Sequence, residues 1–173
     1  STIADSHEDK GDDKQKSEVP QSHPDTSDWQ PLFKKDLSNA RGATDIWQFK
    51  DGVLTAKEDR MLWSDKVYHD YIIDLDFKNG KEANSGVIVD CSNINNGIPN
   101  SIEVQIADDH AEKWAEANPT WHCGAIFGHS PPTKSTVKKP GQWNDYTITV
   151  KGAMIYVMLN GEMVNKIDRR RYT

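Results

Sequence analysis

The chain has 173 residues, which is enough for one domain with a hydrophobic core and short for two. Its formal net charge is −6, and the sequence has no basic stretch suited to a phosphate backbone, which argues against nucleic-acid binding. No apolar stretch reaches the length of a membrane span, so we expect none.

The N-terminal segment differs in composition from the rest of the chain. Residues 1–28 are acidic and contain no aromatic residue, so they cannot bury enough apolar surface to offset the entropy lost on ordering. We therefore expect a disordered acidic tail or linker over 1–28 and a β-sandwich domain over 29–173. The tail has the composition of a tether that follows a removed export signal, so we expect a periplasmic or extracellular location.

From Trp29 onward, short strands are separated by Gly, Asn and Pro turns, and apolar and polar residues alternate within many of them. In chain order, strands are expected at residues 53–56, 61–64, 71–78, 87–89, 102–106, 125–127, 143–151, 154–159 and 163–164. Asn160-Gly161 is the strongest hairpin signal. Helix formers gather only over 109–117, so the pattern predicts an all-β sandwich or jelly roll.

The strand around residues 101–109 is the first candidate for a functional site. Its alternation buries the isoleucines and valine and places Glu103 and Gln105 together on the opposite face. A carboxylate beside an amide suits sugar hydroxyls, and a partly desolvated Glu is suited to act as a general base. The pattern alone favours the simpler alternative, an ordinary solvent-facing sheet surface.

Other polar and aromatic residues allow two interpretations each. Asn84-Ser85-Gly86 either begins the next strand or places an Asn side chain at the rim of the same face. His122 and His129 are seven residues apart, so one continuous strand would place them on opposite faces, which argues against a shared metal. They fit a structural or rim role. Tryptophans either anchor the core or form stacking platforms for sugars; these are Trp114, Trp121 and Trp143.

No motif predicts a metal or a cofactor. The two cysteines, Cys91 and Cys123, lack the spacing of a zinc site, and they form either one disulfide or two free thiols. Phosphate loops, nucleophile-elbow motifs and the His-Glu-x-x-His motif are absent from the sequence. We therefore expect no bound cofactor and no metal.

Seven short motifs in order make the chain resemble the 3-keto-disaccharide hydrolase domain family, from Trp29 to about Asp168. They are PLFKKDL from residue 31, YHDY from 68, NSGV from 84, EVQIAD from 103, GAIFG from 124, KPGQWN from 139 and LNG from 159. The resemblance implies a concanavalin-like jelly roll, exported by bacteria, that acts on glycosides oxidised at the 3-position. A carbohydrate substrate is then the expected partner.

The resemblance also implies which residues form the site. The family's acidic strand corresponds to Glu103, Gln105 and Asp108, and its Asn-Ser-Gly turn begins at Asn84. We hypothesise that Glu103 removes the C2 proton that a 3-keto group acidifies, with Gln105 and Asn84 as hydrogen-bond donors. Asp108 or His129 would assist proton transfer.

His129 and Trp143 join Asn84 and Gln105 as the expected substrate-binding residues. Two alternatives from other classes stay open. One is a non-catalytic carbohydrate-binding module, which a shallow groove floored by Trp would favour. The other is a scaffold domain with no sugar site, which a covered Glu103 would favour.

The sequence departs from the family pattern at two places. The family often carries Arg in the strand after the Asn-Ser-Gly turn, where this chain has Asp90. Members also close the sandwich with a final strand pair, whereas the sequence ends at Thr173 soon after the last predicted hairpin. We expect the closing strand to be missing or to come from elsewhere, which would leave a sheet edge open to pairing.

Overall fold

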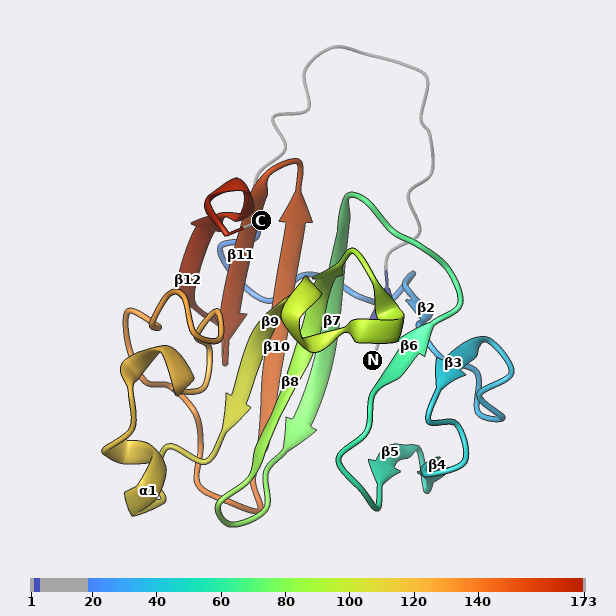
Figure 1. Cartoon of the computed structure of the whole chain (residues 1–173), viewed down its shortest axis with the longest axis horizontal. Coiled ribbons are helices and arrows are strands. Elements are labelled where there is room, and N and C mark those ends of the chain that lie inside the picture. The colour runs from blue at the N-terminus through green and yellow to red at the C-terminus, as the bar shows by residue number, and fades with distance from the viewer. Residues whose placement is uncertain (1, 4–18, 173) are drawn as a thin grey trace.

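The alternating segments of the sequence form two packed layers of antiparallel strands in a concanavalin-like jelly roll (Figure 1). The structure is a computed structural model that describes residues 2–3 and 19–172. Helix is confined to short segments: α1 (Glu112–Ala115), η1 (Ile94–Asn96), η2 (Ile98–Asn100), η3 (Pro119–Trp121) and η4 (Arg169–Arg171). In this described part, no helix is long and apolar enough to cross a membrane.

The larger layer is a sheet in the order β12-β11-β10-β7-β1-β2, with every neighbouring pair antiparallel. Its strands are β12 (Glu162–Asp168), β11 (Met154–Leu159), β10 (Trp143–Lys151), β7 (Tyr71–Lys78), β1 (Thr2–Ile3) and β2 (Gln30–Pro31). The predicted hairpin at Asn160-Gly161 is confirmed, because both residues have the positive φ values, 52° and 79°, that a tight β-turn of this kind needs.

The second layer is built on β8 (Asn84–Cys91) and β9 (Ser101–Ala107), which lie in front of β10 and β7 (Figure 1). Residues 125–127 run along the free side of β9 through a single bridge between Val104 and Ile126. Two small sheets flank this layer: β3 (Ala40–Gly42) with β6 (Leu62–Ser64), and β4 (Trp47–Lys50) with β5 (Val53–Ala56).

The hydrophobic core lies between the two layers. Val104 of β9 and Ile126 face Tyr146 and Ile148 of β10, and all four side chains are fully buried. The Tyr146 hydroxyl donates a 2.6 Å hydrogen bond to the backbone carbonyl of Gln105, which ties the layers together. Both cysteines are free, and the Cys123 sulfur lies 3.3 Å from the Tyr146 hydroxyl.

Part of the segment predicted to be disordered packs on the large sheet. We call residues 19–28 the N-terminal strap. Val19 and Gln21 line a hollow with Tyr156 of β11 and Lys166 of β12, and His23 contacts β7 and β10. The strap therefore crosses the outer face of the sheet, while residues 4–18 of the predicted tail lie outside the described residues.

One edge of the large sheet is β12. The neighbouring loop lies along it, because the Thr133 amide donates to the Val164 carbonyl at 2.7 Å. The buried Asn165 amide also donates to the carbonyls of Ser130 and Pro131, at 3.0 and 3.2 Å. Within the described residues, this loop therefore covers part of the β12 edge, whereas a missing closing strand was expected to leave a sheet edge open.

Candidate functional site

The side of β8 and β9 that points away from the core carries the candidate site. Side chains alternate along β9, so Ile102 and Val104 enter the core while Glu103 and Gln105 point outward. The register places Gly86 of β8 opposite Gln105. We call this surface the Glu103 face and define it by Asn84, Gly86, Glu103, Gln105 and Phe127.

The Glu103 carboxylate lies directly over the backbone of Gly86. A Cβ atom built at Gly86 would be 1.9 Å from Glu103 Oε1 and 2.6 Å from its Cγ, so only glycine leaves room for this conformation. A glycine inside a strand often marks such a close approach, and this is the sequence signal that could have identified Gly86.

The environment of Glu103 favours its protonated form. Burial raises the pKa of the Glu103 carboxyl above its ordinary value of 4.5, and the negative charge of Asp59 raises it further. Asp59 is an exposed residue between β5 and β6, so a residue distant in the sequence contributes to the electrostatics of this face. A carboxylate with a raised pKa suits a general base or acid near neutral pH.

Gln105 and Asn84 form an amide pair beside Glu103. Gln105 Nε2 donates a 2.8 Å hydrogen bond to Asn84 Oδ1. Gln105 is only 1% exposed, whereas Asn84 is exposed at the start of β8. The buried amide therefore orients the exposed one, and because the Asn84 carbonyl oxygen accepts this bond, its NH₂ group is available as a donor. The sequence predicted both residues on this face but not the burial of Gln105.

An aromatic pair lies on the other side of Glu103. The backbone amide of Phe127 donates to the Glu103 carbonyl at 2.9 Å, which places Phe127 across from Glu103 on the same face. The rings of Phe127 and Trp121 are stacked, with centroids 6.2 Å apart, and the two side chains are 38% and 41% exposed. Exposed stacked rings beside polar groups are suited to the apolar face of a sugar.

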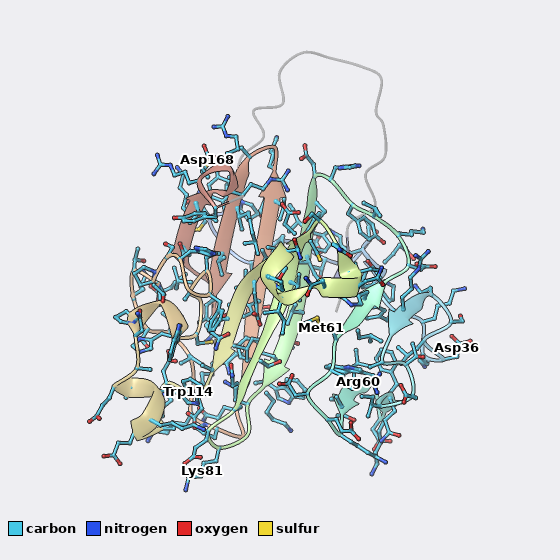
Figure 2. The ribbon with its side chains drawn as sticks, in the orientation of Figure 1. Asp36, Arg60, Met61, Lys81, Trp114 and Asp168 are labelled. Atoms are coloured by element: carbon cyan, nitrogen blue, oxygen red, sulfur yellow. The ribbon has the colours of Figure 1, made fainter. Side chains whose placement is uncertain are left out.

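β6 packs against the 3-10 helices η1 and η2 beside the second layer (Figure 1). Trp63 of β6 and Met61 contact Gly97 between η1 and η2, since a Cβ there would lie 3.0 Å from Trp63 and 3.2 Å from the Met61 sulfur. Figure 2 shows Met61 near the centre of the molecule, beside the second layer. On the opposite flank, Trp114 of α1 anchors the helix by donating to the Glu82 carbonyl at 3.1 Å (Figure 2).

The structure places the other predicted site residues elsewhere. Asp108 is buried, and its two oxygens accept hydrogen bonds from the backbone amides of Glu82 and His110, at 2.9 and 3.2 Å. Trp143 lies at the start of β10 on the outer face of the large sheet, with Lys78 Nζ 4.9 Å from its ring centroid. Neither residue joins Glu103 on its face.

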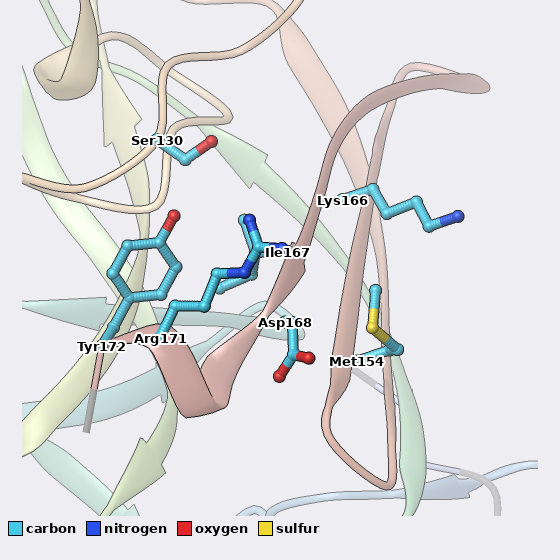
Figure 3. A pocket seen from close by; sticks show the side chains of 7 residues that line it. All are labelled: Ser130, Met154, Lys166, Ile167, Asp168, Arg171 and Tyr172. Carbon is cyan, nitrogen blue, oxygen red and sulfur yellow. The ribbon is translucent and has the colours of Figure 1, made fainter.

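His129 packs against Tyr172, with ring centroids 4.7 Å apart. Tyr172 lines a hollow of about 450 Å³ near the C-terminal end (Figure 3). The other lining residues are Ser130, Met154, Lys166, Ile167, Asp168 and Arg171. The hollow contains no residue of the Glu103 face, so His129 is associated with a different surface.

His122 has a buried atom that lacks a hydrogen-bond partner. Within the described part of the chain, His122 Nε2 is the one buried side-chain N or O atom of this kind. The neighbouring carboxylate of Asp109 accepts hydrogen bonds from the Cys123 amide at 3.0 and 3.2 Å. Burial raises the pKa of Asp109, although that amide and the adjacent histidines lower it. No pattern in the sequence distinguishes His122 from an ordinary structural histidine.

Asp90, which stands where the family often has Arg, is paired with a guanidinium from elsewhere in the chain. Arg169 Nη1 of η4 lies 2.9 Å from Asp90 Oδ2. The ion pair connects the end of β8 to the C-terminal segment. Because the two side chains are 32% and 28% exposed, we attribute only a small part of the stability to it.

Comparison with known proteins shows the family and supports the fold. The model of the 3-keto-alpha-glucoside-1,2-lyase-like domain matches residues 28–173. A "putative glycosyl hydrolase" from Parabacteroides distasonis ATCC 8503, solved at 2.00 Å, is 45% identical, with a TM-score of 0.80 over 84% of this chain and 74% of its own. No curated protein matches the chain.

Two further structures share the fold. Both are described in the same words and come from the same organism. One is 24% identical, with a TM-score of 0.71 over 80% of this chain and 73% of its own. The other is 19% identical, with a TM-score of 0.57 over 78% of this chain and 62% of its own. At these identities the likeness extends to the fold alone.

Proposed function

Because this chain belongs to the 3-keto-α-glucoside-1,2-lyase-like domain family of carbohydrate-active, hydrolase-like proteins, we propose that it cleaves 3-keto glycosides by elimination followed by hydration. The observation that carries the proposal is a half-buried carboxylate with a raised pKa, Glu103, beside an oriented amide pair. The exposed Phe127–Trp121 pair next to it offers a surface for the sugar ring.

The proposed reaction follows from the acidity of a carbon next to a ketone. Glu103 takes the proton from C2 of the 3-keto sugar, and negative charge develops on the C3 oxygen. The Asn84 NH₂ group, held in place by Gln105, donates a hydrogen bond to that oxygen. The electron pair then forms the C1–C2 double bond as the C1–O bond breaks, and the aglycone leaves with the proton that Glu103 took from C2.

Water completes the reaction. Its hydroxyl group adds to C1, and the Glu103 carboxylate transfers the remaining proton of the water to C2, so the products are the free 3-keto sugar and the aglycone. Gln105 acts through Asn84 and is a positioning residue. The expected export to the periplasm or outside the cell, inferred from the acidic N-terminal composition, remains part of this proposal.

A panel of glycosides tests the reaction class. The purified chain is incubated with 3-keto glucosides and with the matching unoxidised glucosides, and release of a chromogenic aglycone is followed. We expect release from the 3-keto forms alone, since an unoxidised ring has no acidic C2 proton. Equal cleavage of both forms would contradict the elimination.

A second function from another class also has a specific observation in its favour. The exposed Trp121–Phe127 pair resembles the platform of a carbohydrate-binding module. The two functions differ in what they require of Glu103, because a binding module has no need for a base with a raised pKa. Sugar binding with no cleavage of any 3-keto glycoside would favour the module.

Gly86 is expected to control the position of the base. In Gly86→Ala, the new Cβ would collide with the Glu103 side chain and force the carboxylate away from its present place. We expect kcat to fall by on the order of 10²-fold, since a displacement of about 1 Å of a catalytic group has this effect. Steady-state kinetics on a 3-keto glucoside measure the loss.

Gly80→Ala is the matched control, because Gly80 has no neighbour within 4 Å of its Cβ position. It should keep wild-type kinetics and thermal stability. A Gly86→Ala variant that is folded and fully active would show that the position of the Glu103 side chain is unimportant.

The pH dependence of kcat/KM should reflect the ionisation of Glu103. A general base works only when deprotonated, so kcat/KM should fall as the pH drops through the raised pKa of Glu103, on the acidic limb above pH 4.5. Asp59→Asn removes a negative charge that raises this pKa, so the midpoint of the limb should move to lower pH. If the midpoint of the acidic limb stays at the same pH in Asp59→Asn, the limb arises from a group other than Glu103.

A further inference from the structure

The outer face of the large sheet carries a cluster that the proposed reaction does not use. Asp74 of β7 and Asp145 of β10 both point away from the core, because their neighbours Ile73 and Tyr146 are buried in it. His23 reaches the same place from the N-terminal strap. His23 Nε2 lies 3.1 Å from Asp74 Oδ2 and 3.3 Å from Asp145 Oδ2.

The sheet concentrates negative charge at this point. The register of β7 and β10 places Asp76 directly opposite Asp145, with Asp74 diagonal to it. Carboxylates that face each other across strands repel. Among the described residues, His23 is the one cationic partner paired with Asp74 or Asp145. The arrangement therefore favours an added positive charge between the strap and the sheet.

The geometry matches the ligands of a divalent metal. The His nitrogen and one oxygen from each carboxylate lie within 4.8 Å of one another. Ligands about 2.0–2.2 Å from a tetrahedral zinc ion are roughly 3.3–3.6 Å apart. The two separations from His23 Nε2, 3.1 and 3.3 Å, are close to this range. One imidazole and two carboxylates suit Zn²⁺ or Mn²⁺ better than Ca²⁺ or Mg²⁺, which prefer oxygen alone.

Neighbouring groups orient the two carboxylates. Thr147 Oγ1 donates a 2.8 Å hydrogen bond to Asp74 Oδ1, which leaves Oδ2 directed at His23. The backbone amide of Asp145 is held by Asn160 Oδ1 at 3.0 Å. Such outer contacts commonly fix the ligands of metal sites. His23 is 46% exposed, so solvent can reach the cluster and complete the coordination.

We propose that His23, Asp74 and Asp145 form a zinc-type divalent-metal site that fastens the N-terminal strap to the outer face of the sheet. Asp74 and Asp145 are 13% and 24% exposed, so they form a prearranged pair of ligands, and the strap supplies the third.

The site is distinct from the Glu103 face, because the two lie on opposite layers of the sandwich. Its role would be structural. A metal that binds only when His23 meets the two carboxylates stabilises the docked strap by mass action. The prediction from sequence that no metal is bound would then be wrong, since no motif brings these three residues together.

Zinc binding to the chelator-treated full chain tests the proposal. Titration calorimetry with ZnCl₂ gives the affinity, and metal analysis after dialysis gives the stoichiometry. We expect one zinc per chain, a rise of a few degrees in the unfolding temperature, and slower protease cleavage within residues 19–28. Ca²⁺ at the same concentration should give a much smaller shift.

The variants identify the ligands. His23→Gln and Asp145→Asn should each weaken zinc binding at least about tenfold. His69→Gln, which removes an exposed histidine elsewhere, and Glu103→Gln should leave it unchanged. No binding at millimolar zinc, or binding that His23→Gln does not weaken, would overturn the site and leave His23 as a hydrogen-bonding residue only.

Discussion

Glu103→Gln is expected to lower kcat on a 3-keto glucoside by about 10²- to 10⁴-fold, because it removes the base and leaves the shape of the side chain. Glu103 is half-buried over Gly86, and an isosteric amide fits the same space. Its burial already raises the pKa of the carboxyl, so an uncharged side chain is well tolerated there. We therefore expect an unchanged unfolding temperature.

Two measurements separate loss of chemistry from loss of binding. Sugar affinity, measured by calorimetry with the unreactive variant, should stay within a few-fold of the wild-type KM if Phe127, Trp121 and Asn84 hold the substrate. Glu112→Gln in α1, an exposed Glu at the other flank, is the matched control and should have wild-type kinetics. Cleavage by Glu103→Gln at the wild-type rate would remove Glu103 from the mechanism.

The largest effect on stability is expected at Tyr146. Its fully buried ring lies 4.8 Å from the ring of Phe77, and its hydroxyl bonds to the Gln105 carbonyl across the core. Tyr146→Ala should lower the free energy of unfolding by about 3–5 kcal/mol, since it leaves a cavity that rigid layers cannot close. Urea unfolding followed by tryptophan fluorescence measures the loss.

Tyr146→Phe separates the hydroxyl from the ring. It keeps the packing and removes this donor, while the Gln105 carbonyl still accepts a hydrogen bond from the Gly124 amide at 3.0 Å. A loss of about 0.5–1.5 kcal/mol is therefore expected. Tyr156→Phe, at a half-buried tyrosine of β11, should change the stability by less than about 0.5 kcal/mol. A Tyr146→Phe variant as stable as the wild type would show that the bond between the layers contributes nothing.

Local patterns were sufficient to predict most strands. Alternation over 71–78, 101–107 and 143–151 matches β7, β9 and β10, because each strand buries one face in the same core. The predicted helical excursion shortens to α1, and β3 and β4 were missed because short exposed strands carry little apolar alternation. Residues 125–127 form isolated bridges from Ile126 to Val104 and to Ser130 in place of the predicted strand, since a turn follows at once.

The site depends on contacts that no local pattern contains. The sequence predicted Glu103, Gln105 and Asn84 on one face, and these three lie together. It could not show that Phe127 would lie across from Glu103, because the pairing joins segments that α1 and η3 separate in the sequence. The same limit applies to His23, whose contacts with Asp74 and Asp145 exist only once the strap crosses the sheet.

The most direct test of the central claim is the fate of hydrogen at C2. A 3-keto glucoside is cleaved in D₂O, and the released 3-keto sugar is analysed at once by mass spectrometry and NMR, with an enzyme-free sample to correct for spontaneous exchange. Removal of the C2 proton by Glu103 predicts one deuterium at C2 for each aglycone released. Aglycone release with no deuterium at C2 beyond the enzyme-free sample would contradict the elimination and favour direct displacement at C1.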